Sequence, residues 1–151
     1  MKKLTQRGRH CVLPINGDVL SELRLSLTHS LSLVFTDCYG TESQLSIREA
    51  ITLTVHGVDT RLEGGRSDAD FNPKGLTAVV SLLGCTVSDA VAFNDGRLTI
   101  HFSEGHCLSV TPGSGFEAWE FRYPRPGRPP GGDVKLHISI VGDDGRLILT
   151  R

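Results

Sequence analysis

Short runs of alternating hydrophobic and polar residues dominate the chain. Within Leu98–Ser103, for example, apolar residues occupy every second position, which is typical of a strand with one buried face. Turn residues bound this run, with Asn94–Gly96 before it and Glu104–Gly105 after it. Similar short runs occur at 23–27, 31–35, 45–47, 51–55, 108–110, 120–123, 135–141 and 146–150. The pattern predicts antiparallel strands over most of the chain.

Two parts of the chain carry the same pattern at a nearly constant offset. When Gly17 is aligned with Gly84, a shift of 67 residues (84 − 17), residues 31–37 fall on residues 98–104 without a gap. Polar residues and turn positions match as well as apolar ones, which is the signature of a degenerate internal repeat. After the next hairpin the shift falls to 63, because the first copy has a turn four residues longer.

These matches predict two related β-meanders, over about residues 17–55 and 84–123, followed by a C-terminal hairpin over 134–151. We expect the alternating run at 51–55 to extend the first half. Residues 124–132 hold four prolines and three glycines, which predicts an irregular surface loop.

One segment between the two halves has a helical pattern. Asn72 suits a cap and Pro73 a first helical position, while Gly84 can end the helix. Apolar residues follow the i, i+3, i+4, i+7 rule at Leu76, Val79, Val80 and Leu83. The sequence therefore predicts an α+β fold, mostly β: antiparallel sheets, or a β-sandwich, from two meander halves with one covering helix over about 73–83.

Charge is distributed unevenly along the 151 residues. The first ten residues hold four basic and no acidic residues, so the remainder holds 12 basic against 17 acidic residues, a net charge of −5. We expect a flexible basic tail over 1–10 and a single domain over 11–151. The acidic body argues against nucleic acid as a partner, since nucleic acid favours a basic face.

Export and membrane insertion are not expected. The apolar run Cys11–Ile15 is only five residues long and contains Pro14, too little for a signal peptide. No stretch approaches the roughly 20 apolar residues of a membrane span. The four cysteines form no CxxC pair and are expected to be reduced thiols, as is usual in the cytoplasm.

Motifs for catalysis, cofactors or metals are not evident in the sequence. It lacks the GxSxG, HExxH, P-loop and GxGxxG patterns. His106 and Cys107 are neighbours, but adjacent strand residues point to opposite faces and cannot easily reach one metal ion. We therefore expect no catalytic, cofactor-binding or metal-binding residues. An enzyme remains an alternative, and a pocket around His101 or His106 would favour it.

The segment Pro112–Phe121 contains the only tryptophan, Trp119, between Glu117 and Glu120. An exposed tryptophan among acidic residues would anchor an interface. A buried one would hold the last strands to the core, and we favour this second interpretation.

The runs 96–105, 108–112 and 116–120, the last reading Phe-Glu-Ala-Trp-Glu, resemble a bacterial, mainly actinobacterial, family of unknown function. Its members end their second half in a Tyr/Phe-Glu-Ala/Ser-Trp-Glu/Gln motif, and the resemblance spans roughly residues 15–151. The chain differs from that pattern at Glu104–Gly105, in a longer linker at 64–72 and in the loop 124–132.

Similar proteins look like the immunity proteins of bacterial toxin systems. The resemblance implies a non-enzymatic cytoplasmic protein that binds a cognate toxin directly, with no cofactor. A structural interaction module of a larger assembly is the other alternative. If an acidic surface covers a basic toxin, we expect contacts from Asp68, Asp70, Glu104, Glu117 and Glu120.

Overall fold

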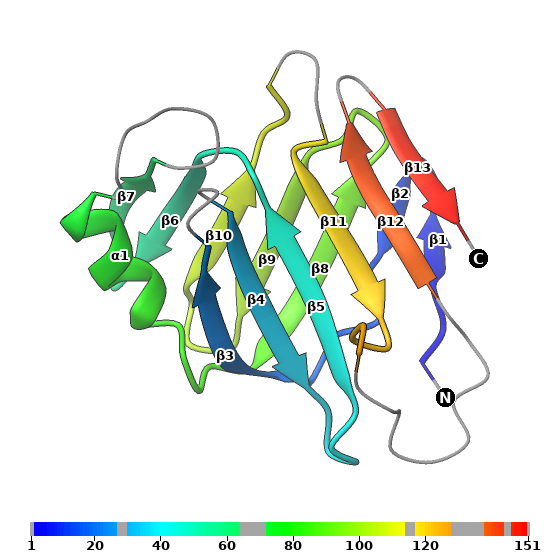
Figure 1. The fold of residues 1–151 in the computed structure, drawn as a ribbon, viewed down its shortest axis with the longest axis horizontal. Coiled ribbons are helices and arrows are strands. Elements are labelled where there is room, and N and C mark those ends of the chain that lie inside the picture. The colour runs from blue at the N-terminus through cyan, green and yellow to red at the C-terminus, as the bar shows by residue number, and fades with distance from the viewer. Residues whose placement is uncertain are drawn as a thin grey trace.

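The computed structural model describes residues 2–26, 30–63, 72–113, 117–127, 138–143 and 146–150. Within these residues the chain forms two antiparallel sheets and one helix (Figure 1). The elements are β1 (Thr5–Arg7), β2 (His10–Val12), β3 (Val19–Leu25), β4 (Leu31–Thr36), β5 (Glu42–Ile47), β6 (Ile51–Val55), β7 (Val58–Leu62), α1 (Pro73–Val80), β8 (Val87–Phe93), β9 (Leu98–Phe102), β10 (Cys107–Val110), β11 (Trp119–Tyr123), β12 (Ile138–Asp143) and β13 (Arg146–Thr150).

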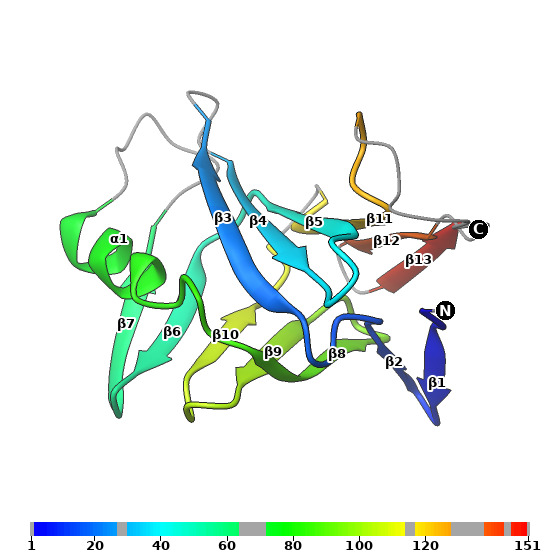
Figure 2. The same cartoon turned by 90° about the horizontal axis from the view of Figure 1, so that it is seen from below.

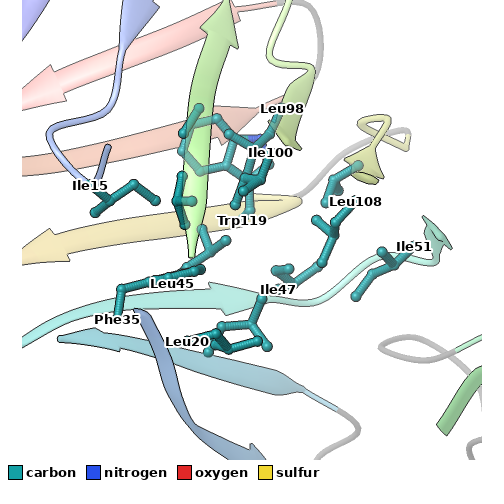
Figure 3. Close-up of a cluster of buried hydrophobic side chains, with 14 of the residues drawn as sticks. Ile15, Leu20, Phe35, Leu45, Ile47, Ile51, Leu98, Ile100, Leu108 and Trp119 are labelled. Atoms are coloured by element: carbon teal, nitrogen blue, oxygen red, sulfur yellow. The ribbon is translucent and has the colours of Figure 1, made fainter. Parts of the chain in front are cut away.

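The predicted fold class is confirmed. A seven-stranded sheet has the order β1-β2-β8-β9-β10-β6-β7, and a six-stranded sheet has the order β13-β12-β11-β5-β4-β3. Figure 2 views the sheets from below, with α1 at one end and β1 and β2 at the other. The alternating apolar side chains of both sheets point inward, and Figure 3 labels several of them, including Phe35, Leu45, Ile100 and Trp119.

Each half gives one strand to the other half's sheet. The sequence pattern led us to expect β6 to extend the first half, and this is wrong: β6 pairs with β10, with Leu53 opposite Leu108. In the matching exchange β11 pairs with β5, with Phe121 opposite Leu45. Alternation fixes which face of a strand is buried but not which strand lies beside it. The exchange therefore depends on tertiary packing.

The helix is shorter than predicted. α1 ends at Val80, and the next residues form tight turns in which Leu82 N–H donates to the Val79 carbonyl (3.1 Å). Leu82 is buried by this turn, whereas Val80 and Leu83 of the predicted apolar stripe are exposed. Asn72 occupies the cap position without a side-chain cap bond. Its amide instead donates to the Arg61 carbonyl of β7 (2.9 Å).

The N-terminal segment is not the predicted flexible tail. Residues of β1 and β2 form a hairpin, with Arg7 opposite His10, and β2 continues the sheet beside β8. Cys11 and Leu13 are buried. The segment is held in place because β2 pairs with β8, whose edge would otherwise be open, and adds apolar side chains there. At the other end of the chain, β12 and β13 pair from Ser139–Thr150 to Asp143–Arg146.

Candidate interaction site

The turn between β4 and β5, residues 37–41, forms a well-braced hairpin end that we call the β4–β5 tip (Figure 1). The last pair of the ladder is Thr36 with Glu42, and Asp37 N–H then donates to the Thr41 carbonyl (3.0 Å). Gly40 supplies the left-handed conformation that this turn needs, with φ +81°.

Asp37 fixes the tip with its side chain. Its Oδ1 accepts hydrogen bonds from the backbone N–H groups of Tyr39 (2.9 Å) and Thr41 (2.8 Å). A carboxylate that bonds to following backbone N–H groups holds a turn in one conformation. The direction in which the tip presents Tyr39 is therefore set by the turn itself.

Tyr39 is the most exposed large hydrophobic residue of the described chain, with 82% of its surface accessible. With this much of its surface accessible, its ring does not reach the core. Tyrosine is enriched at the energetic centres of protein interfaces, because it buries a large ring at small cost in conformational entropy. An exposed tyrosine on a turn with a fixed backbone is thus suited to anchor a partner.

A buried polar cluster lies beneath the tip. The Lys2 amine bonds to the Asp18 carboxylate, and Lys2 Nζ lies 3.7 Å from Asp37 Oδ2. The same amine lies 5.1 Å from the ring centroid of Tyr123. Burial raises the pKa of Asp18, although the Lys2 bond opposes this, and burial also raises the pKa of Tyr123. Lys2 therefore links the N-terminal segment to the tip.

Arg125 braces the tip from the other side. Its guanidinium is only 4% exposed, and Nη1 lies 3.1 Å from Glu22 Oε2 and 3.0 Å from Glu42 Oε2. Its backbone N–H also donates to the Glu42 carbonyl (2.7 Å). Bonds from Arg24 and then Arg125 hold the pKa of Glu22 below its ordinary value.

The charges around the tip largely neutralise one another. Four carboxylates (Asp18, Glu22, Asp37, Glu42) face three basic groups (Lys2, Arg24, Arg125) in these ion pairs. These ion pairs hold the tip in place. Because their charges nearly cancel, they produce only a weak electrostatic field around the tip. The exposed chemistry of the tip therefore comes from the aromatic ring and hydroxyl of Tyr39 and from the thiol of Cys38.

Three of the five predicted partner-binding residues lie in the described chain, while Asp68 and Asp70 lie outside it. Glu117 pairs with Arg48 (2.9 Å), and Glu120 pairs with Arg122 (2.7 Å). Glu104 lies beside Cys85, whose thiol pKa is raised by burial and then by this carboxylate.

The structure does not gather these acids on one surface. Glu104 belongs to the β9–β10 turn and Glu117 to the segment before β11, and these segments lie at opposite ends of β10 (Figure 1). Two of the three acids already have basic partners. Among the described residues, Glu104 and Glu117 therefore do not share one acidic face.

Two of the described histidines, His56 and His106, serve the packing of turns. His106 is buried, and its Nδ1 accepts the backbone N–H of His56 (3.3 Å) while the two rings meet edge to face at 4.7 Å. His101 is exposed on β9. Among the described residues, no group of three His, Cys, Asp or Glu side chains could hold a metal ion.

An open groove of about 400 Å³ lies between α1 and the β6–β7 hairpin. Its lining residues are Val55, Thr60, Pro73, Lys74, Thr77, Ala78 and Ser81. The Thr77 and Ser81 hydroxyls donate to helix carbonyls at 2.9 and 2.8 Å. The lining thus offers hydroxyls and one amine, without a carboxylate or an imidazole.

Trp119 is a core residue, as predicted. It is buried between the sheets (Figure 3), and its indole N–H donates to the Gly96 carbonyl (2.7 Å). Tyr39, in contrast, was not among the residues predicted to bind a partner. Its signal was an aromatic residue in the turn between two alternating runs, where side chains are commonly exposed.

No helix of the described residues is long and apolar enough to cross a membrane. The sequence model of a family of unknown function, DUF6188, matches residues 11–137. This match confirms the predicted resemblance at the level of an uncharacterised domain family. Neither a curated protein nor a solved structure matches the chain significantly.

Proposed function

The chain belongs to DUF6188, a family of unknown function, and we propose that it is a non-enzymatic protein that binds another protein through the β4–β5 tip. The exposure of Tyr39 on a braced turn carries this proposal. Because the tip is already ordered, binding would lose little conformational entropy there.

The chemistry of the tip indicates the kind of surface it fits. Tyr39 would insert its ring into an apolar pocket whose rim holds a hydrogen-bonding group for the hydroxyl. Glu42 and Glu22 would lie at the rim, where their charges are partly compensated by Arg125. Charges at the rim of an interface change the association rate more than they change the binding affinity.

In its most concrete form, the partner is a cognate bacterial toxin in the cytoplasm, and this chain is the immunity protein that occludes it. The likeness of similar proteins to immunity proteins, which the family resemblance implies, supports this form. Charge contacts from Asp68, Asp70, Glu104, Glu117 and Glu120 stay a prediction, and ion pairing of the last two would weaken their contribution.

The test is genetic. The gene is deleted in its native host, with the neighbouring genes either intact or disrupted. The deletion strain is then complemented with the wild type, with Tyr39→Ala, or with the matched control Val58→Ala, an exposed apolar residue on β7.

We expect deletion to impair growth only while a neighbouring gene is functional. The wild type and Val58→Ala should restore growth, and Tyr39→Ala should not. Growth that is unaffected by deletion in both backgrounds would contradict the immunity function. Rescue by Tyr39→Ala at wild-type protein level would contradict the role of the tip.

A further inference from the structure

Three of the four sheet edges carry a feature that prevents pairing with another strand. β1 is only three residues long and polar, and β3 has a bulge between Leu20 and Glu22. At β7, the Asn72 side chain bonds to the Arg61 carbonyl and accepts the Glu63 N–H (2.9 Å). Short strands, bulges and covered backbone groups are the usual protection of an edge.

The fourth edge, β13, has none of these features in the described residues. It pairs with β12 over five consecutive residues without a register shift. Its central residues are Leu147, Ile148 and Leu149, and the last two are 41% and 43% exposed. A regular, apolar and exposed edge strand is a template for one more strand.

The sequence of β13 is self-complementary. Leu-Ile-Leu is symmetric about Ile148, so antiparallel pairing of two copies about this residue sets Leu147 opposite Leu149 of the second copy. Ile148 then faces its own equivalent, and Arg146 faces Thr150, so no like charges oppose each other. A two-fold contact needs this kind of self-complementary surface.

We propose that β13 pairs antiparallel with β13 of a second copy of this chain, centred on Ile148, and joins the two six-stranded sheets into one. The inference is independent of the proposed function, because β12 and β11 separate β13 from β5 and the β4–β5 tip (Figure 1). The homodimer would leave Tyr39 of both copies exposed.

The first test traps the predicted register. In a background in which Cys38→Ser and Cys107→Ser remove the thiols that are not buried, Ile148→Cys is compared with Thr150→Cys under mild oxidation. Directly opposed residues of an antiparallel pair lie about 5 Å apart and can form a disulfide, whereas two residues at 150 would lie more than about 10 Å apart.

We expect Ile148→Cys to form a covalent dimer at least about tenfold faster than Thr150→Cys. Equal rates, or faster crosslinking at position 150, would overturn the predicted pairing. Circular dichroism shows whether each variant is folded, and only folded variants are compared.

The second test measures the free association of the unmodified chain by sedimentation over roughly 1 µM to 1 mM. The wild type should dimerise within this range, and Ile148→Lys should weaken association about tenfold or more, because two lysines would face each other. The control Val58→Lys on β7 should dimerise like the wild type. A wild type that stays monomeric throughout would overturn the proposal.

Discussion

Val19 and Thr86 face each other in a single antiparallel bridge, and they occupy equivalent positions of the two halves, 67 residues apart. The flanking hydrogen bonds obey the same equivalence. Leu20 N–H donates to the Cys85 carbonyl (3.0 Å), and Val87 N–H donates to the Asp18 carbonyl (2.8 Å). An approximate two-fold axis therefore passes between Val19 and Thr86.

Further features of the fold obey the same two-fold relation. The bulge in β3 lies between Leu20 and Glu22, and the bulge in β8 lies between Val87 and Asp89. β6 of the first half lies in the seven-stranded sheet, and β11 of the second half lies in the six-stranded sheet. This exchange obeys the same two-fold relation. The geometric equivalence is a property of the fold, while a duplication in the sequence stays a prediction.

The two-fold relation predicts equal roles for Gly17 and Gly84. Their φ angles are +85° and +83°, and at either position a Cβ added to the glycine would have no other atom within 4 Å. Alanine at either position should cost about 1 kcal/mol of unfolding free energy from backbone strain alone. Urea denaturation of both variants checks this, with asparagine variants as milder controls. A large loss at only one of the two positions would contradict the equivalence.

Gly75 should be required for the docking of α1 on β7. A Cβ at this position would lie 2.7 Å from Leu62 Cα and 2.9 Å from the Arg61 carbonyl oxygen. Gly75→Ala gains about 1 kcal/mol of helix propensity but loses about 1–3 kcal/mol by overpacking against the backbone. We therefore expect net destabilisation in urea denaturation. The exposed Lys74→Ala is the control, and a stabilised Gly75→Ala would show that α1 can move away freely.

Trp119→Phe should lower the unfolding free energy by about 1–3 kcal/mol, because the buried Gly96 carbonyl loses its donor and a smaller ring leaves space. The thermal midpoint should fall accordingly in calorimetry. Tyr39→Phe, which removes only an exposed hydroxyl, should leave the midpoint nearly unchanged. Equal midpoints for wild type and Trp119→Phe would mean that the indole hydrogen bond contributes nothing.

Asp18 and Glu22 should give the stability opposite dependences on pH. Burial raises the folded pKa of Asp18 above its ordinary 3.8, so its contribution is present below that value and is lost as pH rises through the folded pKa. Arg24 and Arg125 lower the folded pKa of Glu22 below 4.5, so its contribution is present above 4.5 and is lost as pH falls.

Urea denaturation of Asp18→Asn and Glu22→Gln between about pH 3 and pH 7 separates the two effects. The stability of the wild type relative to Asp18→Asn should fall with rising pH, and relative to Glu22→Gln it should rise. If the wild type gained stability over Asp18→Asn as pH rose, the Lys2 ion pair would dominate over burial.

The sequence by itself determined the fold class and most of the strands with their buried faces, although β1, β2, β7 and β8 were not among the predicted runs. Period-2 runs such as Leu98–Phe102 specify a half-buried strand locally, and glycines such as Gly40 and Gly96 mark turns by their backbone freedom. The burial of Trp119 was also predictable, because a large apolar side chain gains most from the core.

Only the tertiary structure decided which strands are neighbours and which groups meet. The exchange of β6 and β11, the pairing of β2 with β8, and the ion pairs of Lys2 with Asp18 and Asp37 join residues far apart in the chain. Local periodicity carries no information about such long-range partners, since any strand of the right alternation could fill the same place in a sheet. The bracing of the β4–β5 tip by Lys2 and Arg125 was decided there too, because these ion pairs form only in the folded chain.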